Sequence, residues 1–217
     1  MEKNAGSAGI FAKNNARKCC AGVAGMLQLS CTQKPASHDR QNGSKRCHGK
    51  EDFGMKVAMI GHKDFPSRSG GVEVKVGGLA TSLVRRGYEV TVYNRGLQKG
   101  HNVYTTEGVQ ARRIFTFQKA SLNAMVYSFL ATFDALTRDC DVIHYHAIGP
   151  SVPLVIAKLF GKHTVCTVHG LNWKVDKWGG FASAYLRLGE RVAAKYADDL
   201  VVLSESEWNY FQEKYDR

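Results

Sequence analysis

The chain has 217 residues, which allows one domain of ordinary size or one domain with a tail. Hydrophobic residues make up 44% of it and aromatic residues 10%, so there is enough apolar material for a packed core, and global disorder is excluded. No stretch is long and apolar enough for a membrane-spanning helix. The net charge of +11 favours polyanionic partners: nucleic acid, anionic membrane or phosphorylated substrates.

Residues 1–54 differ in composition from the rest of the chain. They are rich in Ala, Gly, Ser, Asn and Lys, carry nine basic against four acidic residues, and show no sustained strand or helix period. We interpret them as a disordered basic extension. Three alternatives stay open: a signal peptide with Ala21–Leu29 as its apolar region, a zinc site from the segment's cysteines and His48, or a segment outside the functional protein, which would then start at Met55.

From Met55 onward, strand-like and helix-like segments alternate. Short apolar runs predict buried strands, and apolar residues at three- and four-residue spacing predict helices. In chain order, the expected elements are a strand over 56–61, a helix over 72–84, strands over 89–94 and 109–115, a helix over 121–138, a strand over 141–146, a helix over 150–160, a strand over 163–169, a helix over 181–196, a strand over 200–203 and a final helix. This alternation predicts an α/β fold with a doubly wound, parallel, Rossmann-like sheet.

Several local signals refine these elements. Ser204 and Glu207 have the spacing of a capping box at the start of the last helix. Gly77 and Gly78 lie inside a helix, where glycine is unfavourable, so they suggest close packing against a neighbour. Cys140 and Cys166 lie in strand-like runs, and we interpret them as small buried hydrophobic residues in a reducing compartment.

Histidines gather where the predicted strands end. Ligands of doubly wound sheets bind beyond the carboxyl ends of the strands. Those ends are Gly61-His62, His144-Tyr145-His146, His169-Gly170 and Ser204, and three of the four carry histidine. His144 and His146 are two positions apart, so they lie on one face of their strand. The sequence therefore predicts a histidine-rich site at this edge.

The loop after the first strand excludes two nucleotide-binding motifs. It has neither the G-x-G-x-x-G dinucleotide fingerprint nor the P-loop pattern. What it offers is Gly70 and Gly71 at the entry to a helix, where free amides and the helix dipole favour an anion. The alternative is a loop that needs glycine only for a positive φ.

These motifs together resemble one enzyme family. The run 55–61, followed by Pro66-Ser67-Arg68-Ser69-Gly70-Gly71-Val72-Glu73, resembles the opening of glycosyltransferase family 4 enzymes with the GT-B fold. The segments 86–92, 141–146, 167–170 and 201–205 resemble later strands of that family, in the same order. The P-x-x-x-G-G-x-E pattern is most similar to the bacterial rhamnosyltransferase-like subgroup that builds surface polysaccharides.

The resemblance implies the acceptor-side half of such an enzyme. GT-B enzymes have two Rossmann-like domains with the site between them, and the second holds most contacts to the nucleotide sugar and the acidic E-x7-E motif. The resemblance covers residues 55–217, so we expect an N-terminal half that is inactive alone and is completed by a C-terminal half in cis or in trans. The nucleotide sugar is a substrate, so no cofactor is expected.

Roles for single residues follow from the same resemblance. Gly70 and Gly71 would place amides near the donor diphosphate, and His169 matches the histidine that reaches the donor sugar or phosphate. A strand-end histidine with a structural hydrogen bond is the alternative for His169. His146 would line the acceptor pocket, with Asn172 and Trp173 in the loop that follows His169. A structural role for His146 and interdomain packing of that loop are the alternatives. The family is retaining, but no carboxylate here stands out as a nucleophile.

The sequence also bears on metal binding and on a non-catalytic function. His144, His146 and His169 could form a three-histidine metal site, but GT-B enzymes generally need no metal, so none is expected. The alternative to an enzyme is a basic module that binds nucleic acid or anionic membrane, and no aromatic-basic recognition motif supports it. We expect a cytoplasmic protein with a glycan or lipid-linked acceptor, peripheral contact with anionic membrane at the inner face, and no nucleic acid partner.

Overall fold

The computed structural model describes residues 54–96, 103–117, 120–170 and 180–217. The strands are β1 (Lys56–Ile60), β2 (Glu89–Gly96), β3 (Val103–Thr106), β4 (Val109–Phe115), β5 (Val142–His146), β6 (His163–Thr167) and β7 (Asp199–Val201). The helices are α2 (Gly71–Val84), α3 (Ala120–Thr137), α4 (Leu154–Leu159), α5 (Gly180–Tyr196) and α6 (Glu205–Tyr215). The predicted alternation of strands and helices is confirmed, and none of these helices is long and apolar enough to cross a membrane.

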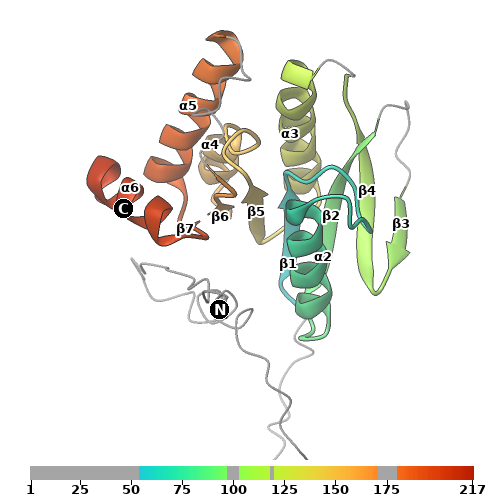
Figure 1. Cartoon of the computed structure of the whole chain (residues 1–217). Coiled ribbons are helices and arrows are strands. Elements are labelled where there is room, and N and C mark those ends of the chain that lie inside the picture. Colours follow the sequence, from blue (N-terminus) through green and yellow to red (C-terminus); the bar gives the residue numbers. More distant parts are fainter. Residues whose placement is uncertain (1–53, 97–102, 118–119, 171–179) are drawn as a thin grey trace, which may run out of the picture.

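The described strands form one seven-stranded sheet in the order β3-β4-β2-β1-β5-β6-β7 (Figure 1). Every pairing is parallel except that of β3 with β4. Without β3, the order is that of a Rossmann-type sheet, whose direction of winding reverses between β1 and β5. This confirms the predicted fold class and puts the carboxyl ends of β1, β5 and β6 at the point where ligands of such sheets bind.

Two elements differ from the prediction. β3 was missed, because it is an edge strand with no buried residue and so lacks the apolar run of the inner strands. The helix predicted over 150–160 is reduced to α4, because 147–153 form turns after the end of β5. Ala147 begins these turns with a φ of 81°, in the left-handed region that is unfavourable for a residue with a Cβ.

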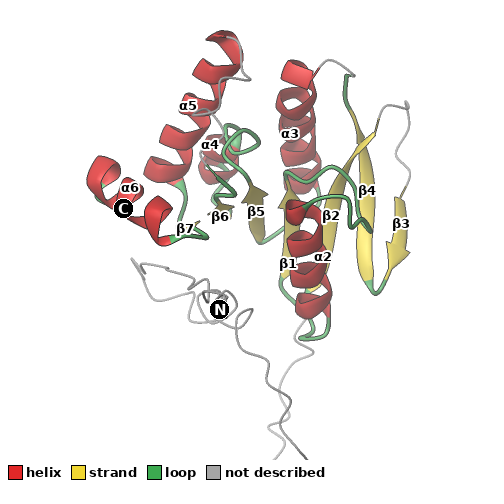
Figure 2. Ribbon diagram, viewed as in Figure 1, coloured by secondary structure: helices red, strands yellow, loops and turns green. Residues whose placement is uncertain are grey.

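Helices cover both faces of the sheet (Figure 2). One face carries alternate strand residues, such as Val57, Met59 and Val92, which pack with Val76 and Leu83 of α2. The other face carries the intervening residues, which pack with residues of α3, α4 and α5. A third cluster joins α5 to α6 beyond β7. Because successive side chains of a strand point to opposite faces, the one sheet contributes to a separate hydrophobic core on each face.

The structure confirms the predicted capping box and one of the two predicted close contacts of glycine in α2. The N–H of Glu207 donates to Ser204 Oγ at 3.2 Å, as the capping box predicts, while the Glu207 carboxylate accepts from the N–H of Leu203. A Cβ at Gly77 would contact Phe65 at 3.5 Å, but one at Gly78 would meet nothing within 4 Å, so only Gly77 packs against a neighbour.

The two cysteines of the folded body match their interpretation as buried hydrophobic residues. Both thiols are free and buried. Burial raises the pKa of Cys140 to about 11 and that of Cys166 to about 12, so neither is a reactive thiolate at neutral pH. The extension predicted over residues 1–54 lies outside the described residues except for Gly54.

Candidate functional site

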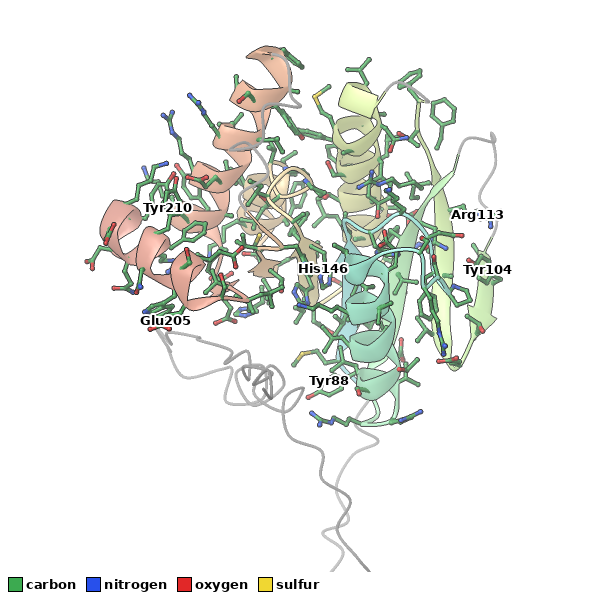
Figure 3. The ribbon with its side chains drawn as sticks, in the orientation of Figure 1. Tyr88, Tyr104, Arg113, His146, Glu205 and Tyr210 are labelled. Carbon is green, nitrogen blue, oxygen red and sulfur yellow. The ribbon has the colours of Figure 1, made fainter. Side chains whose placement is uncertain are left out.

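The ends of β1 and β5 meet closely at the carboxyl edge of the sheet. Gly61 follows β1 with a φ of +128°, and a Cβ there would lie only 2.1 Å from the carbonyl oxygen of His146. Only glycine permits both the backbone angle and this contact. The approach places His62, the second residue after β1, near His146, the last residue of β5. Figure 3 shows His146 between α2 and the side of the sheet that carries α5 and α6.

The three predicted histidines form one cluster. The rings of His144 and His146 stack with their centroids 4.1 Å apart, as expected for residues on one face of β5. His146 Nδ1 lies 3.3 Å from Nε2 of His169, which follows β6. His144 Nε2 is 2.7 Å from the hydroxyl of Thr167. The prediction that β5 and β6 bring histidines together at their carboxyl ends is therefore confirmed.

These histidines are neutral at physiological pH. Burial lowers the pKa of His144 to about 3 and, assisted by the charge of Lys75, that of His169 to about 4. The pKa of His146 is also well below its ordinary value, because of burial and then of the neighbouring histidines. A neutral imidazole has one donor and one acceptor nitrogen, so the cluster is suited to orienting polar groups rather than to attracting anions by charge.

His62 also belongs to this cluster, although we assigned it no role from the sequence. Its side chain is 1% exposed, and its Nε2 lies 2.9 Å from Oδ1 of Asn94 in β2. Burial lowers the pKa of His62 to about 4. The position of His62 at a strand end was visible in the sequence. The partner was not, because nothing in the sequence places a side chain from the middle of β2 against the end of β1.

The start of α2 holds Gly70 and Gly71 without any need for positive φ. Gly70 has an extended backbone with φ −158°, and Gly71 begins the helix, so the alternative based on positive φ is wrong. A Cβ at Gly70 would lie 2.3 Å from the carboxylate of Glu73, whereas one at Gly71 would meet nothing within 4 Å. Gly71 therefore leaves open space beside the first turn of α2.

Glu73 is a second residue of the site to which the sequence analysis assigned no role. It is 7% exposed, and its Oε1 accepts a hydrogen bond of 3.2 Å from the N–H of Lys63. A carboxylate in the first turn of a helix interacts favourably with the helix dipole. Glu73 thus fixes the loop that follows β1 against α2. Its only sequence signal was its place in the P-x-x-x-G-G-x-E pattern.

Arg95 supports the same edge from β2. Its guanidinium donates to the carbonyl oxygen of Gly61 at 3.0 Å and to the side chain of Asn123 at 3.2 Å, and it lies 5.2 Å from the ring centre of Tyr127. The Tyr127 hydroxyl accepts from the N–H of Gly61 at 3.1 Å. The backbone at the end of β1 is thus held by side chains from two other elements, which makes the site rigid on this side.

Two predicted site residues cannot be placed. Asn172 and Trp173 fall within 171–179, outside the described residues. Within the described residues, no group of three or more His, Cys, Asp or Glu side chains has an arrangement that could hold a metal ion. The predicted residues that the structure does bring to one edge of the sheet are His146, His169, Gly70 and Gly71.

Comparison with known proteins agrees with this architecture. Residues 69–217 match the sequence profile of Glycosyltransferase Family 4. Among solved structures, sucrose-phosphate synthase from Thermosynechococcus elongatus superposes with a TM-score of 0.58 at 15% sequence identity, over 74% of this chain and 45% of that chain. The chain thus spans less than half the length of that structure. A search of curated protein sequences finds no significant match.

The profile match covers more than half of the chain, from Ser69, just before α2, to Arg217, just after α6. The structural likeness independently supports the GT-B type of fold. We conclude that the chain belongs to glycosyltransferase family 4, whose members transfer sugars.

Proposed function

We propose that this domain is the acceptor-side half of a retaining glycosyltransferase, which moves a hexosyl or rhamnosyl group from a nucleotide-sugar donor to a glycan or lipid-linked acceptor. We assign it to surface polysaccharide synthesis, together with a second Rossmann-like half in cis or in trans. The observation that carries the proposal is the cluster of neutral histidines at the carboxyl ends of β5 and β6, in a family 4 domain.

The first role in this proposal is binding of the donor diphosphate. The free amides at the start of α2 and the positive end of its dipole stabilise negative charge. The open space at Gly71 lets a phosphate oxygen approach the backbone. Charge develops on the diphosphate as the glycosidic bond breaks, so amides placed there stabilise the transition state more than the ground state.

The second role is orientation of the sugars. His169 is the catalytic residue of the proposal: its imidazole reaches the donor sugar or phosphate from the end of β6. His146 lines the acceptor pocket, together with Asn172 and Trp173. Because burial keeps these rings neutral, each can donate or accept a hydrogen bond without attracting a counter-ion. The nucleotide sugar is a substrate, and the proposed reaction uses neither a cofactor nor a metal ion.

The proposal is tested by assaying transfer from a panel of nucleotide sugars to methyl glycosides. The 217-residue chain is assayed alone and with the C-terminal half of a family 4 enzyme supplied in trans or by fusion. We expect little transfer by the chain alone and protein-dependent transfer by the combined halves. Absence of both transfer and sugar binding in every combination would refute the proposed function. Robust transfer by the chain alone would refute the assignment to one half of the site.

A specific surface supports peripheral contact with anionic membrane as an additional property. The outer side of α5 carries Arg187, Arg191 and Lys195, and Phe181 and Leu188 on the same helix are 68% and 48% exposed. The helix also borders a hollow of about 380 Å³. Basic and apolar side chains on one amphipathic helix are suited to a lipid interface.

The membrane contact is tested by vesicle sedimentation. Vesicles with anionic lipids should retain the chain at low salt and release it at high salt, and Arg191→Glu should weaken retention. Arg85→Glu, on the exposed end of α2, is the matched control and should behave as the unmodified chain. Equal retention by neutral and anionic vesicles would contradict this contact.

A further inference from the structure

Two ring nitrogens in the candidate site are buried without a hydrogen-bond partner. They are Nδ1 of His62 and Nε2 of His146, and neither has a partner among the described residues. The two side chains are 1% and 2% exposed. Buried polar atoms in folded proteins nearly always have a partner, so each exception calls for an explanation. Six buried side-chain atoms among the described residues lack a partner, and these two ring nitrogens lie at the carboxyl edge of the sheet, as does Nε of Arg95.

The tautomer of His62 follows from its neighbours. Asn94 Nδ2 lies 2.8 Å from the carbonyl oxygen of Phe65, which can only accept, so the amide orientation is fixed. Asn94 Oδ1 must then accept from His62 Nε2, which therefore carries the proton. Because burial keeps this ring neutral, Nδ1 holds a free lone pair. His62 thus presents a pure hydrogen-bond acceptor.

The two orphaned nitrogens share one corner of the fold. Gly61 packs directly against the backbone of His146, and His62 is the next residue. His62 is also among the groups whose field lowers the pKa of His146. His146 uses its other nitrogen toward His169, so its Nε2 remains for a further partner.

The chemistry of this corner suits a hydroxyl group. A hydroxyl donates one hydrogen bond and accepts others, so one hydroxyl can serve an acceptor nitrogen and its neighbour together. An ionised phosphate oxygen has no proton to give to His62 Nδ1, and the neutral rings supply no charge to attract it. The same argument separates this corner from the start of α2, where free amides favour an anion.

We propose that His62 Nδ1 accepts a hydrogen bond from a hydroxyl group of a sugar substrate, and that His146 Nε2 contacts the same hydroxyl. This inference rests on the proposed function. Asn94 acts as a positioning residue, because it fixes the tautomer of His62 without touching the sugar. The hydroxyl belongs either to the donor sugar or to the acceptor sugar, and the two sources are separated by experiment.

The first measurement is made on the full chain without any substitution. Long-range proton–nitrogen NMR correlations of the ¹⁵N-labelled protein report which ring nitrogen carries a proton, and His62→Phe assigns the signals. We expect His62 to be protonated at Nε2 and bare at Nδ1. A proton on Nδ1 would overturn the proposal before any ligand is added.

The second measurement adds the probes in separate arms. UDP-glucose and GDP-mannose represent the donor, UDP and GDP represent the donor without the sugar that it transfers, and methyl glucoside and methyl rhamnoside represent the acceptor. We expect the His62 Nδ1 signal to move in a sugar-bearing arm and not with UDP or GDP. The arm that moves it identifies the source of the hydroxyl. His163, at the opposite end of β6, is the internal control and should not respond.

The third measurement compares affinities. His62→Phe should weaken binding of the responsive sugar about tenfold, as loss of one buried hydrogen bond predicts, whereas His163→Gln should leave it unchanged. If His169 and Gly71 signals respond to sugars while His62 does not, His62 holds only a buried water and the inference fails, although the proposed function stands. A response of His62 to UDP or GDP alone would likewise overturn it. If no signal responds to any sugar, in the chain alone or combined with the second half, the proposed function itself fails.

Discussion

At the scale of single residues, the site is defined by histidines that burial keeps uncharged. A neutral ring can orient a substrate hydroxyl or stabilise a leaving group through one N–H, and a rigid setting makes that contact effective. His169 is the least buried of the cluster described above and lies at the end of β6, 3.3 Å from His146. It is therefore the ring best placed to reach a ligand from this edge.

His169→Ala should lower turnover far more than stability. Loss of a positioned polar group at a transition state costs roughly 2.7–4 kcal/mol, or about a hundred- to a thousandfold in rate. The measurement is kcat and KM of the enzyme with its second half supplied, beside the unfolding midpoint. His163→Gln, at the far end of the same strand, is the control. Unchanged turnover of His169→Ala would mean that the histidine is structural.

Gly71→Val should weaken nucleotide-sugar binding with little loss of stability. A Cβ at this position meets nothing within 4 Å, so the fold accommodates the side chain, but a branched side chain would fill the space beside the first turn of α2. Titration with nucleotide sugars and thermal unfolding together test this. Gly71→Ala serves as the milder comparison. Equal affinity of the valine variant and the unmodified chain would contradict a phosphate contact here.

At the scale of elements, one buried carboxylate holds the last two helices together. Glu190 of α5 is 1% exposed, and its Oε1 accepts from Tyr210 at 2.8 Å, Lys214 at 2.8 Å and Tyr215 at 2.7 Å, all in α6. Burial and then the bond to Glu190 raise the pKa of Tyr215 to about 12, so this hydroxyl remains a donor. The contact fixes α6 on the body of the domain.

Glu190→Ala should loosen α6 selectively. Three donors would lose their bond to Glu190, each worth about 0.5–3 kcal/mol, and water screens the charge of Lys214, whose side chain is 43% exposed. Glu190→Gln keeps an acceptor oxygen and should cost less. Urea unfolding gives the free energy, and amide hydrogen exchange should show earlier loss of protection in α6 than in β1. Glu213→Ala, on the exposed face of α6, is the control. Equal loss of amide protection in α6 and β1 would contradict a local role of Glu190 in holding α6.

At the scale of the whole molecule, the inner strands of the sheet could be predicted from the sequence, because buried parallel strands consist of nearly continuous apolar residues. The exposed edge strand β3 and the turns of 147–153 were not, since exposure removes the apolar pattern. The site likewise has a part that the sequence predicts and a part that it does not. Strand ends predicted His146 and His169, whereas the contact of His62 with Asn94 depends on how β1 and β2 align side by side.

Stability should fall as the pH is lowered through the range in which histidines titrate. His62, His144 and His169 have folded pKa values below the unfolded value of about 6.5, so the unfolded chain binds protons first. The loss begins near pH 6.5 and continues to about pH 3, and His62 alone contributes on the order of 3 kcal/mol. Urea unfolding at several pH values measures it, and a flat profile would contradict buried neutral rings.

His163 opposes this trend. Its hydrogen bond to Asp199 raises its pKa, so it adds stability at low pH and loses that contribution as the pH rises through the folded pKa. The unmodified chain should therefore gain stability from His163 as the pH falls through the raised pKa to about 6.5, and His163→Gln should remove this gain. Profiles of the two proteins that run parallel above about pH 6.5 would show that the pair contributes nothing.

Residues 54–217 should fold without the residues that precede them. Both main core clusters consist of residues from Val57 onward, and the start of β1 is tied down by its own contacts: Glu89 N–H donates to the Met55 carbonyl at 3.2 Å, and a Cβ at Gly54 would lie 1.8 Å from the carbonyl oxygen of Gly87. Thermal unfolding of the full chain is compared with chains that start at Gly54 and at Met55. We expect midpoints within about 4 °C, on the order of 1 kcal/mol for a domain of this size. A larger drop for both shortened chains would show that residues 1–53 pack on the domain, and a drop for the Met55 chain alone would locate the stabilising contact at Gly54.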